Sequence, residues 1–407
     1  MRVLLVNTYA RSGGASVAAQ RLCAALNRAG VEARLLVQNP EGSAAPDLLT
    51  TADRWAVRRP WLDALPTFFY RNRRTPHWGN AWLNNRATRQ VISHFAPEVI
   101  HLHWVNHGML SVHDIARLRG PLVWTLHDSW VFTGGCHSPQ DCLRYQQQCG
   151  YCPELRSQRE QDLSWRGWQR KQTAWRGVSF TVITPSRWLA AAAASSSLMA
   201  GRRIVVIPNA VDTATLKPGD RAAARHALGL PANAPVFLFG AHGAASDWNK
   251  GLDLWQAALP FVARQHPEAI ALVAGLSGGT LSGLPLPVRE LGMLNPTQLA
   301  QAMLAADATV IPSRMENLPN IAAESLACGT PVAAFAVGGI PEMIENGSTG
   351  FLAHPHEPES LAQALGRLLA QGAGMRAACI TAAQGRYAPD LVARQHIELY
   401  QSLLESE

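Results

Sequence analysis

The side chains best suited to chemistry in this sequence include two glutamates in its second half. Glu316 and Glu324 stand eight residues apart, with Pro319 between them. Proline disfavours a single helix through both positions, so we expect Glu316 on a loop and Glu324 one or two turns inside the following helix. A carboxylate accepts two hydroxyl hydrogen bonds, which suits a hexose or a ribose. The alternative is two surface glutamates, one of them a favourable charge at a helix N-terminus.

Groups that bind anions accompany these glutamates. The amides of Leu318, Asn320 and Ile321 fall at the predicted helix start, where unpaired N–H groups attract phosphate. Lys250 lies between a predicted strand and a predicted helix, where a phosphate would meet both an ammonium and a helix N-terminus. An ordinary surface lysine is the alternative, and Asp247 beside it weakens the electrostatic argument.

The first half of the chain offers further candidates at strand ends. Gly13 and Gly14 follow the first predicted strand, where glycines let the backbone approach a ligand closely. They do not form a G-x-G-x-x-G motif. His127 and Asp128 end another predicted strand, and ligands of open parallel sheets gather beyond the strand carboxyl ends. His103 ends the preceding strand. A hydrogen-bonded structural role is the alternative for both histidines, and for His103 we favour it.

Four of the seven cysteines crowd into a short segment, at Cys136, Cys142, Cys149 and Cys152. Four thiolates suffice for a closed tetrahedral zinc site, and His137 could replace one sulfur. Two disulfides or unligated thiols are the alternatives, and the expected cytoplasmic location argues against disulfides. We therefore predict a structural zinc ion in a Cys-rich insertion at residues 136–152.

The elements that position these residues alternate between strands and helices. Apolar runs predict strands at residues 2–9, 32–39, 98–105, 121–128, 179–186, 234–243, 269–276, 308–313 and 330–337. Amphipathic spacing predicts helices at residues 17–30, 251–265, 295–307, 319–329 and 359–372. This alternation predicts two parallel α/β units joined near residue 205.

Length and composition agree with two globular domains. The chain has 407 residues, of which 47% are hydrophobic and 16% charged. It lacks an apolar run of membrane-spanning length, and its N-terminus lacks the features of a signal peptide, so we expect a cytoplasmic protein. The net charge of +7 indicates an acidic partner.

The basic residues concentrate in one aromatic stretch. Residues 54–90 hold eight Arg and one Asp among seven aromatic side chains. One interpretation is a solvated arginine surface around core aromatics. The other is a face that contacts anionic lipid headgroups at the inner side of the plasma membrane, or a lipid diphosphate.

Together these residues resemble glycosyltransferase family 4, of the GT-B fold, over essentially the whole chain. Residues 313–352, "SRMENLPNIAAESLACGTPVAAFAVGGIPEMIENGSTGFL", look like the family's E-x7-E segment and its glycine-rich turn. Residues 124–155, "WTLHDSWVFTGGCHSPQDCLRYQQQCGYCPEL", are similar to a bacterial exopolysaccharide subgroup that includes colanic acid-type transferases.

The resemblance implies two Rossmann-like domains with parallel sheets facing a central cleft. The acceptor-side domain would span residues 1–205 and the donor-binding domain residues 206–385, with a helix at 386–407 packing back toward the first domain. The implied activity is retaining, metal-independent transfer of a hexose from a UDP- or GDP-sugar to a polysaccharide or lipid-linked oligosaccharide. No nucleic-acid partner is expected.

The resemblance also implies roles for particular residues. It assigns Glu316 to the donor sugar, Glu324 to the ribose hydroxyls and Lys250 to the diphosphate. It places His127 near the transferred sugar, Gly14 in the loop near the phosphates, and the backbone near Leu294 at the base.

One departure concerns the diphosphate. Where many members carry an arginine after the strand that precedes the lysine, this chain has Ala241 and His242, and Asn249 stands where arginine often precedes the lysine. Either Lys250 would then neutralise more of the anion, or His242 or an arginine of the first domain would help.

Other functions stay open at this point. They are a GT-B epimerase or phosphorylase, a nicotinamide-dependent oxidoreductase, and a zinc-containing nucleic-acid-binding protein.

Overall fold

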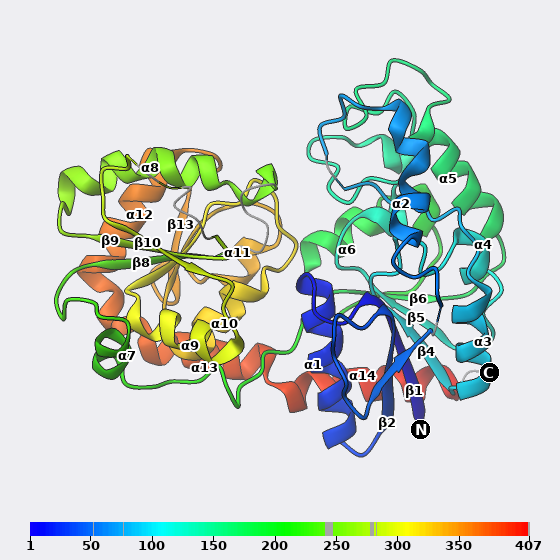
Figure 1. Cartoon of the computed structure of the whole chain (residues 1–407), viewed down its shortest axis with the longest axis horizontal. Helices are drawn as coiled ribbons and strands as arrows, with labels where there is room; N and C mark the ends of the chain where they lie inside the picture. The colour runs from blue at the N-terminus through cyan, green and yellow to red at the C-terminus, as the bar shows by residue number, and fades with distance from the viewer. Residues whose placement is uncertain (52, 76, 241–246, 277–280, 282, 406–407) are drawn as a thin grey trace. The chain divides into compact units, whose positions relative to one another are not determined.

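The chain folds into two α/β units in a computed structural model (Figure 1). The structure describes residues 1–51, 53–75, 77–240, 247–276, 281 and 283–405. Unit 1 comprises Met1–Pro208 and Val392–Glu407, and unit 2 comprises Asn209–Leu391.

Unit 1 is built on a parallel seven-stranded sheet in the order β3-β2-β1-β4-β5-β6-β7. Its strands are β1 (Arg2–Tyr9), β2 (Glu32–Asn39), β3 (Leu48–Thr50), β4 (Val99–Leu102), β5 (Leu122–Thr125), β6 (Thr181–Thr184) and β7 (Ile204–Val206). Its α-helices are α1 (Gly14–Arg28), α2 (Arg59–Ala64), α3 (Arg86–Phe95), α4 (Val112–Ile115), α5 (Leu163–Ala174) and α6 (Arg187–Ala194), together with most of α14 (Pro389–Leu404).

Unit 2 is built on a parallel six-stranded sheet in the order β10-β9-β8-β11-β12-β13. Its strands are β8 (Val236–Gly240), β9 (Ile270–Ala274), β10 (Val288–Gly292), β11 (Ala308–Ile311), β12 (Val332–Phe335) and β13 (Gly350–Ala353). Its α-helices are α7 (Arg221–Ala227), α8 (Leu252–Gln265), α9 (Pro296–Ala305), α10 (Asn320–Cys328), α11 (Ile340–Met343), α12 (Pro358–Gln371) and α13 (Arg376–Tyr387). Figure 1 shows α8 and α12 on one face of this sheet and α9 and α10 on the other.

The burial of each strand explains which strands could be predicted from the sequence. The central strands β4, β5, β9 and β12 are buried throughout, as expected of parallel strands covered by helices on both faces. The strands β3, β7, β10 and β13 were not predicted, and all four lie at sheet edges. β3 and β10 have no fully buried residue, so they lack the continuous apolar run by which a buried strand is recognised.

Each sheet has one point where successive strands are added in opposite directions. In unit 1 this point lies between β1 and β4, and in unit 2 between β8 and β11. Loops that leave such neighbouring strands diverge and open a crevice beyond the strand carboxyl ends, where ligands of doubly wound sheets bind. The candidate residues should therefore gather around these two points.

The C-terminal helix α14 is part of the unit 1 core. Tyr400 is fully buried, and its hydroxyl lies 2.7 Å from Nδ1 of His101 on β4. The hydrophobic side chains Val392 and Leu399 are also buried. Among the described residues, no helix is long and apolar enough to cross a lipid bilayer.

Candidate active site

Lys250 and Glu316 form an ion pair at the strand reversal of unit 2. Lys250 ends the short 3₁₀ helix Trp248–Lys250 after β8, and Glu316 lies in the loop after β11. Lys250 Nζ donates to Glu316 Oε1 over 2.6 Å, and Ser313 Oγ donates to the same oxygen over 3.1 Å. Both charged side chains are partly accessible to solvent, so a ligand can reach them.

The charge on Lys250 is stabilised in place. Burial by itself lowers the pKa of a lysine, because it removes the ammonium from water. Here the Glu316 carboxylate, its hydrogen bond and the charge of Asp247 outweigh burial, so the pKa of Lys250 is raised above its ordinary value. Lys250 therefore stays a cation at neutral pH, as diphosphate binding requires.

Two glycines allow the loops around this pair to approach closely. Gly251 follows Lys250 with φ of +68°, and a Cβ there would lie 1.9 Å from the carbonyl oxygen of Pro312. Gly338 has φ of +57°, and a Cβ there would lie 1.8 Å from the carbonyl oxygen of Glu316. Any side chain at either position would push the loop away. Asn249 Nδ2 also donates to the carbonyl of Met315 over 2.6 Å, which ties the two loops together.

The helix α10 begins next to the Glu316 loop and has features of an anion site. Pro319 is its N-cap residue, and within this described segment no side chain caps the helix and no acidic residue lies in its first turn. Asn320 Oδ1 accepts a hydrogen bond from Asn209 Nδ2 over 3.2 Å. Glu324 lies one turn further along and is 6% exposed. As predicted, Glu316 is on the loop and Glu324 inside the helix.

Three further residues were predicted to contact the donor through their backbone. Leu318, Ile321 and Leu294 are partly buried side chains that pack against the unit 2 core. Leu294 lies in the loop between β10 and α9, after a strand carboxyl end. Ala241 and His242, which replace the expected arginine region, lie outside the described residues.

The Gly13 and Gly14 turn of unit 1 has an internal carboxylate beside it. Gly13 is the N-cap residue of α1 and Gly14 is its first residue. The amides of Arg11 and Ser12 donate to Glu41 Oε2, and the Ser12 hydroxyl donates to the same carboxylate. Burial raises the pKa of Glu41, but these hydrogen bonds lower it more strongly, which favours the charged form. Glu41 was not among the predicted residues, and its charge opposes an anion at this turn.

A row of histidines crosses unit 1 from α14 to the carboxyl end of β5. The ring centroids of His396 and His101 are 5.6 Å apart, those of His101 and His103 4.4 Å, and those of His103 and His127 5.2 Å. Burial lowers the pKa of all four, that of His127 and His396 to about 4. The row is therefore neutral at physiological pH. Only His127 is half-buried rather than buried, so it is the member that a substrate can reach.

The hydrogen bond between His103 and His127 selects their tautomers. His103 Nδ1 lies 2.9 Å from His127 Nε2, so one of the two nitrogens carries the shared proton. His103 Nε2 is buried and has no hydrogen-bond partner among the described residues. A buried N–H without an acceptor is rarer and costlier than an unused lone pair. We therefore assign the proton to His103 Nδ1, which leaves Nδ1–H of His127 as a donor for a substrate oxygen.

This assignment predicts the outcome of replacing His103. His103→Asn places an amide N–H near the original Nδ1 and should keep the His127 tautomer, whereas His103→Leu should leave it unfixed. We expect kcat to fall by roughly tenfold or more in His103→Leu only, because small misplacements of a reacting group can cost about 100-fold. Long-range ¹H–¹⁵N spectra of histidine-labelled protein report the tautomer directly. An Nε2–H tautomer of His127 in the wild-type protein would refute the assignment.

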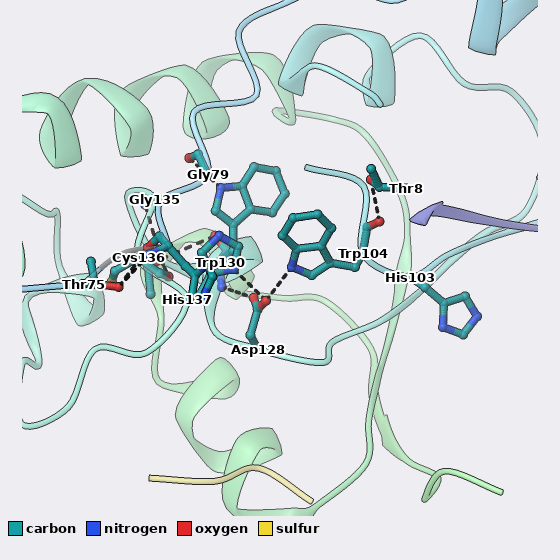
Figure 2. A network of polar contacts seen from close by, with 12 residues as sticks. Thr8, Thr75, Gly79, His103, Trp104, Asp128, Trp130, Gly135, Cys136 and His137 are labelled. Carbon is teal, nitrogen blue, oxygen red and sulfur yellow. Dashed lines mark hydrogen bonds and ion pairs between the residues drawn. The ribbon is translucent and has the colours of Figure 1, made fainter. Parts of the chain in front are cut away.

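Asp128 organises the loop after β5 (Figure 2). Its Oδ2 accepts from Trp104 Nε1 over 2.9 Å and lies 2.6 Å from His137 Nδ1, while its Oδ1 accepts from the Trp130 amide over 2.8 Å. Burial raises the pKa of Asp128, but His137 and these hydrogen bonds lower it below its ordinary value. Asp128 is thus a charged structural centre that orients the residues beside His127.

The four cysteines of the insertion line one cavity, with Thr133, Tyr145 and Ser164 among its other walls. Burial raises the pKa of Cys136 well above its ordinary value, and those of Cys149 and Cys152 to about 12. As positioned, the described residues include no group of three or more His, Cys, Asp or Glu side chains that could hold a metal ion. The structural zinc ion stays a prediction.

Comparison with solved structures identifies the fold. Sucrose-phosphate synthase from Thermosynechococcus elongatus superimposes over 100% of both chains with a TM-score of 0.74 at 21% identity. HepE from Anabaena in complex with UDP-glucose covers 99% of this chain and 100% of its own, with a TM-score of 0.67 at 19% identity. With two parallel α/β units, the chain has the GT-B fold of glycosyltransferases, as predicted.

Family models narrow the class. The glycosyltransferase family 4 model matches residues 12–215, about half of the chain, and a model described as glycosyl transferases group 1 matches residues 235–371. The chain belongs to glycosyltransferase family 4.

Curated relatives cover a smaller part of the chain. D-inositol 3-phosphate glycosyltransferase of Acidothermus cellulolyticus is 36% identical over 187 residues, which are 42% of this chain and 41% of that protein. The protein of the same name from Mycobacterium bovis is 37% identical over 198 residues, which are 46% of this chain and 40% of that protein. The chain thus matches less than half the length of these relatives.

Proposed function

We propose that this protein is a retaining glycosyltransferase that transfers a hexose from a nucleoside diphosphate sugar to a saccharide acceptor, by a route that needs no metal ion. The observation that carries the proposal is the Lys250–Glu316 pair at the strand reversal of unit 2, one loop from the uncapped start of α10. A diphosphate needs fixed positive charge and backbone donors, and a sugar needs carboxylate acceptors. All of these groups lie on the side of the unit 2 sheet where the strands have their carboxyl ends.

The proposed chemistry follows from these groups. The bond between the anomeric carbon and the diphosphate oxygen breaks, and negative charge develops on the diphosphate. Lys250 and the α10 amides stabilise that charge. The acceptor oxygen bonds to the anomeric carbon on the same face, and its proton passes to the departing phosphate oxygen. The Glu324 carboxylate accepts hydrogen bonds from the ribose hydroxyls, and the Glu316 carboxylate accepts them from the hydroxyls of the sugar. His127 donates a hydrogen bond from Nδ1–H to an oxygen of the sugar.

Relatives support the choice of donor. The Anabaena protein HepE, which shares the fold, was crystallised with UDP and with UDP-glucose. A UDP-hexose is therefore the first donor to test, and a GDP-hexose the second. For the acceptor we propose a growing exopolysaccharide or lipid-linked oligosaccharide, on the resemblance of residues 124–155 to exopolysaccharide transferases.

A thermal-shift screen of the full chain with UDP-glucose and GDP-glucose tests the donor site. A ligand that binds only the native state raises the unfolding temperature, and we expect one of the two nucleotides to do so. Glu324→Gln keeps the side-chain volume but removes the charge, so we expect its Kd for that donor to rise about tenfold, the effect of losing roughly 1.4 kcal/mol.

The exposed Glu268→Ala in the same unit is the matched control and should leave binding unchanged. Unchanged donor binding by Glu324→Gln would contradict the site. Transfer to inorganic phosphate instead of a saccharide would make the enzyme a phosphorylase.

A further inference from the structure

One stretch of unit 1 exposes an unusual amount of apolar surface. The described residues of the chain include thirteen large hydrophobic side chains that are exposed, and seven of these fall within residues 55–69. They are Trp55, Val57, Trp61, Leu62, Leu65, Phe68 and Phe69. Trp61 is 78% exposed and Phe69 is 86% exposed, so neither contributes much to the core. Seven exposed large hydrophobic side chains within fifteen residues are characteristic of an interaction site rather than of scattered surface residues.

Arginines surround these side chains. The guanidinium of Arg58 lies 5.3 Å from the ring centroid of Trp55, and that of Arg71 lies 4.3 Å from the centroid of Phe68. Arg54, Arg58 and Arg71 are all exposed. We call the seven hydrophobic side chains and these three arginines the aromatic–arginine surface.

The acidic residues of the same segment are turned inward. Asp53 forms an ion pair with Arg59, and its side chain is only 7% exposed. Asp63 is buried, and its carboxylate accepts from the amides of Ala81 and Trp82 over 3.3 Å each. No other acidic residue occurs in residues 53–75. The outer face of the segment therefore combines apolar and positively charged side chains without an exposed carboxylate.

The segment is held firmly on the body of unit 1. Asn80 Nδ2 and Trp82 Nε1 both donate to the carbonyl of Asp63, over 2.8 and 3.2 Å. The amide of Arg74 donates to the carbonyl of Glu154 over 2.8 Å, and the Tyr70 hydroxyl accepts from the amide of Leu163 over 3.2 Å. These bonds fix α2 and the 3₁₀ helix Leu65–Phe69, whose large apolar side chains are exposed.

We propose that the aromatic–arginine surface docks this protein onto the surface of an anionic lipid bilayer. Trp and Phe side chains partition into the boundary between headgroups and acyl chains, and arginines bind the lipid phosphates. Charge complementarity favours an anionic bilayer as the partner. A partner that contacted only the apolar side chains would leave the three arginines without a counter-charge. The proposal does not depend on the sugar transferred or on the reaction.

Flotation of the full chain with lipid vesicles tests the proposal. We expect binding to vesicles of phosphatidylcholine mixed with phosphatidylglycerol, weaker binding to phosphatidylcholine alone, and loss of binding at high salt. The double variant Trp61→Ser/Phe69→Ser should lower the partition coefficient by at least about tenfold, since it removes the two most exposed aromatic anchors. Arg58→Glu/Arg71→Glu should abolish the preference for phosphatidylglycerol.

The double variant Leu143→Ser/Val206→Ser is the matched control, because it removes two exposed apolar side chains of unit 1 outside the surface. It should bind vesicles like the wild-type protein. All variants change exposed side chains, so their unfolding temperatures should match that of the wild-type chain. Absence of vesicle binding, or equal binding by Trp61→Ser/Phe69→Ser, would overturn the proposal. A wild-type dimer that the same variant converts to a monomer, without any vesicle binding, would assign the surface to a second copy of the chain.

Discussion

Lys250→Ala is expected to lower kcat/KM for sugar transfer by about 100- to 1,000-fold, the usual effect of removing one preorganised charge donor. Lys250 is one of three lysines in the chain, and it would be the main cation on the departing diphosphate. The fall should appear in steady-state kinetics with the donor found in the thermal-shift screen. Lys217→Ala removes an exposed lysine of the same unit and should leave kcat/KM unchanged.

A second variant separates two causes of this loss. Removing Lys250 also leaves the Glu316 carboxylate without its cation, which is unfavourable for a partly buried charge. The double variant Lys250→Ala/Glu316→Gln neutralises that carboxylate. If the missing charge on the diphosphate causes the loss, the double variant stays inactive. Recovery of activity would instead assign Lys250 the role of neutralising Glu316 and would remove it from the proposed chemistry.

Gly338→Ala is expected to destabilise the protein by about 2–4 kcal/mol and to abolish most of the activity. Alanine is strained at φ of +57°, and its Cβ would overlap the carbonyl oxygen of Glu316. The Glu316 carbonyl also accepts a hydrogen bond from the amide of Gly339 over 3.0 Å. Because this bond holds the two segments together, the whole Glu316 loop would have to move away from Lys250. Urea denaturation measures the loss of stability through the midpoint.

Gly347→Ala is the matched control for this prediction. Gly347 has φ of +84°, but the nearest atom to a Cβ there is 3.9 Å away, on the ring of Phe351. This variant should lose about 1 kcal/mol from backbone strain and keep its activity. Equal destabilisation by both substitutions would show that the close approach to the Glu316 carbonyl has no energetic weight.

The elements around the proposed donor site could be predicted from the sequence because their signals are local. Apolar runs marked the central strands, and Pro319 and Gly329 bounded the helix that carries Glu324. The same local rules placed Lys250 after a strand and Glu316 on a loop. The edge strands β3, β7, β10 and β13 escaped them, and three of these, β3, β7 and β10, lack buried residues.

Neighbouring residues in the sequence therefore determined the alternation of strands and helices, the loop position of Glu316 and the resemblance to family 4. Only the tertiary structure decided which of these residues meet. Lys250 and Glu316 pair across 66 positions, and His101 meets Tyr400 across 299. The tertiary structure also decides that the carboxylates of Asp53 and Asp63 are turned inward, which leaves the aromatic–arginine surface without carboxylates. The reason is physical: strand order and side-chain burial depend on packing between segments far apart in the chain, and no local periodicity encodes that packing.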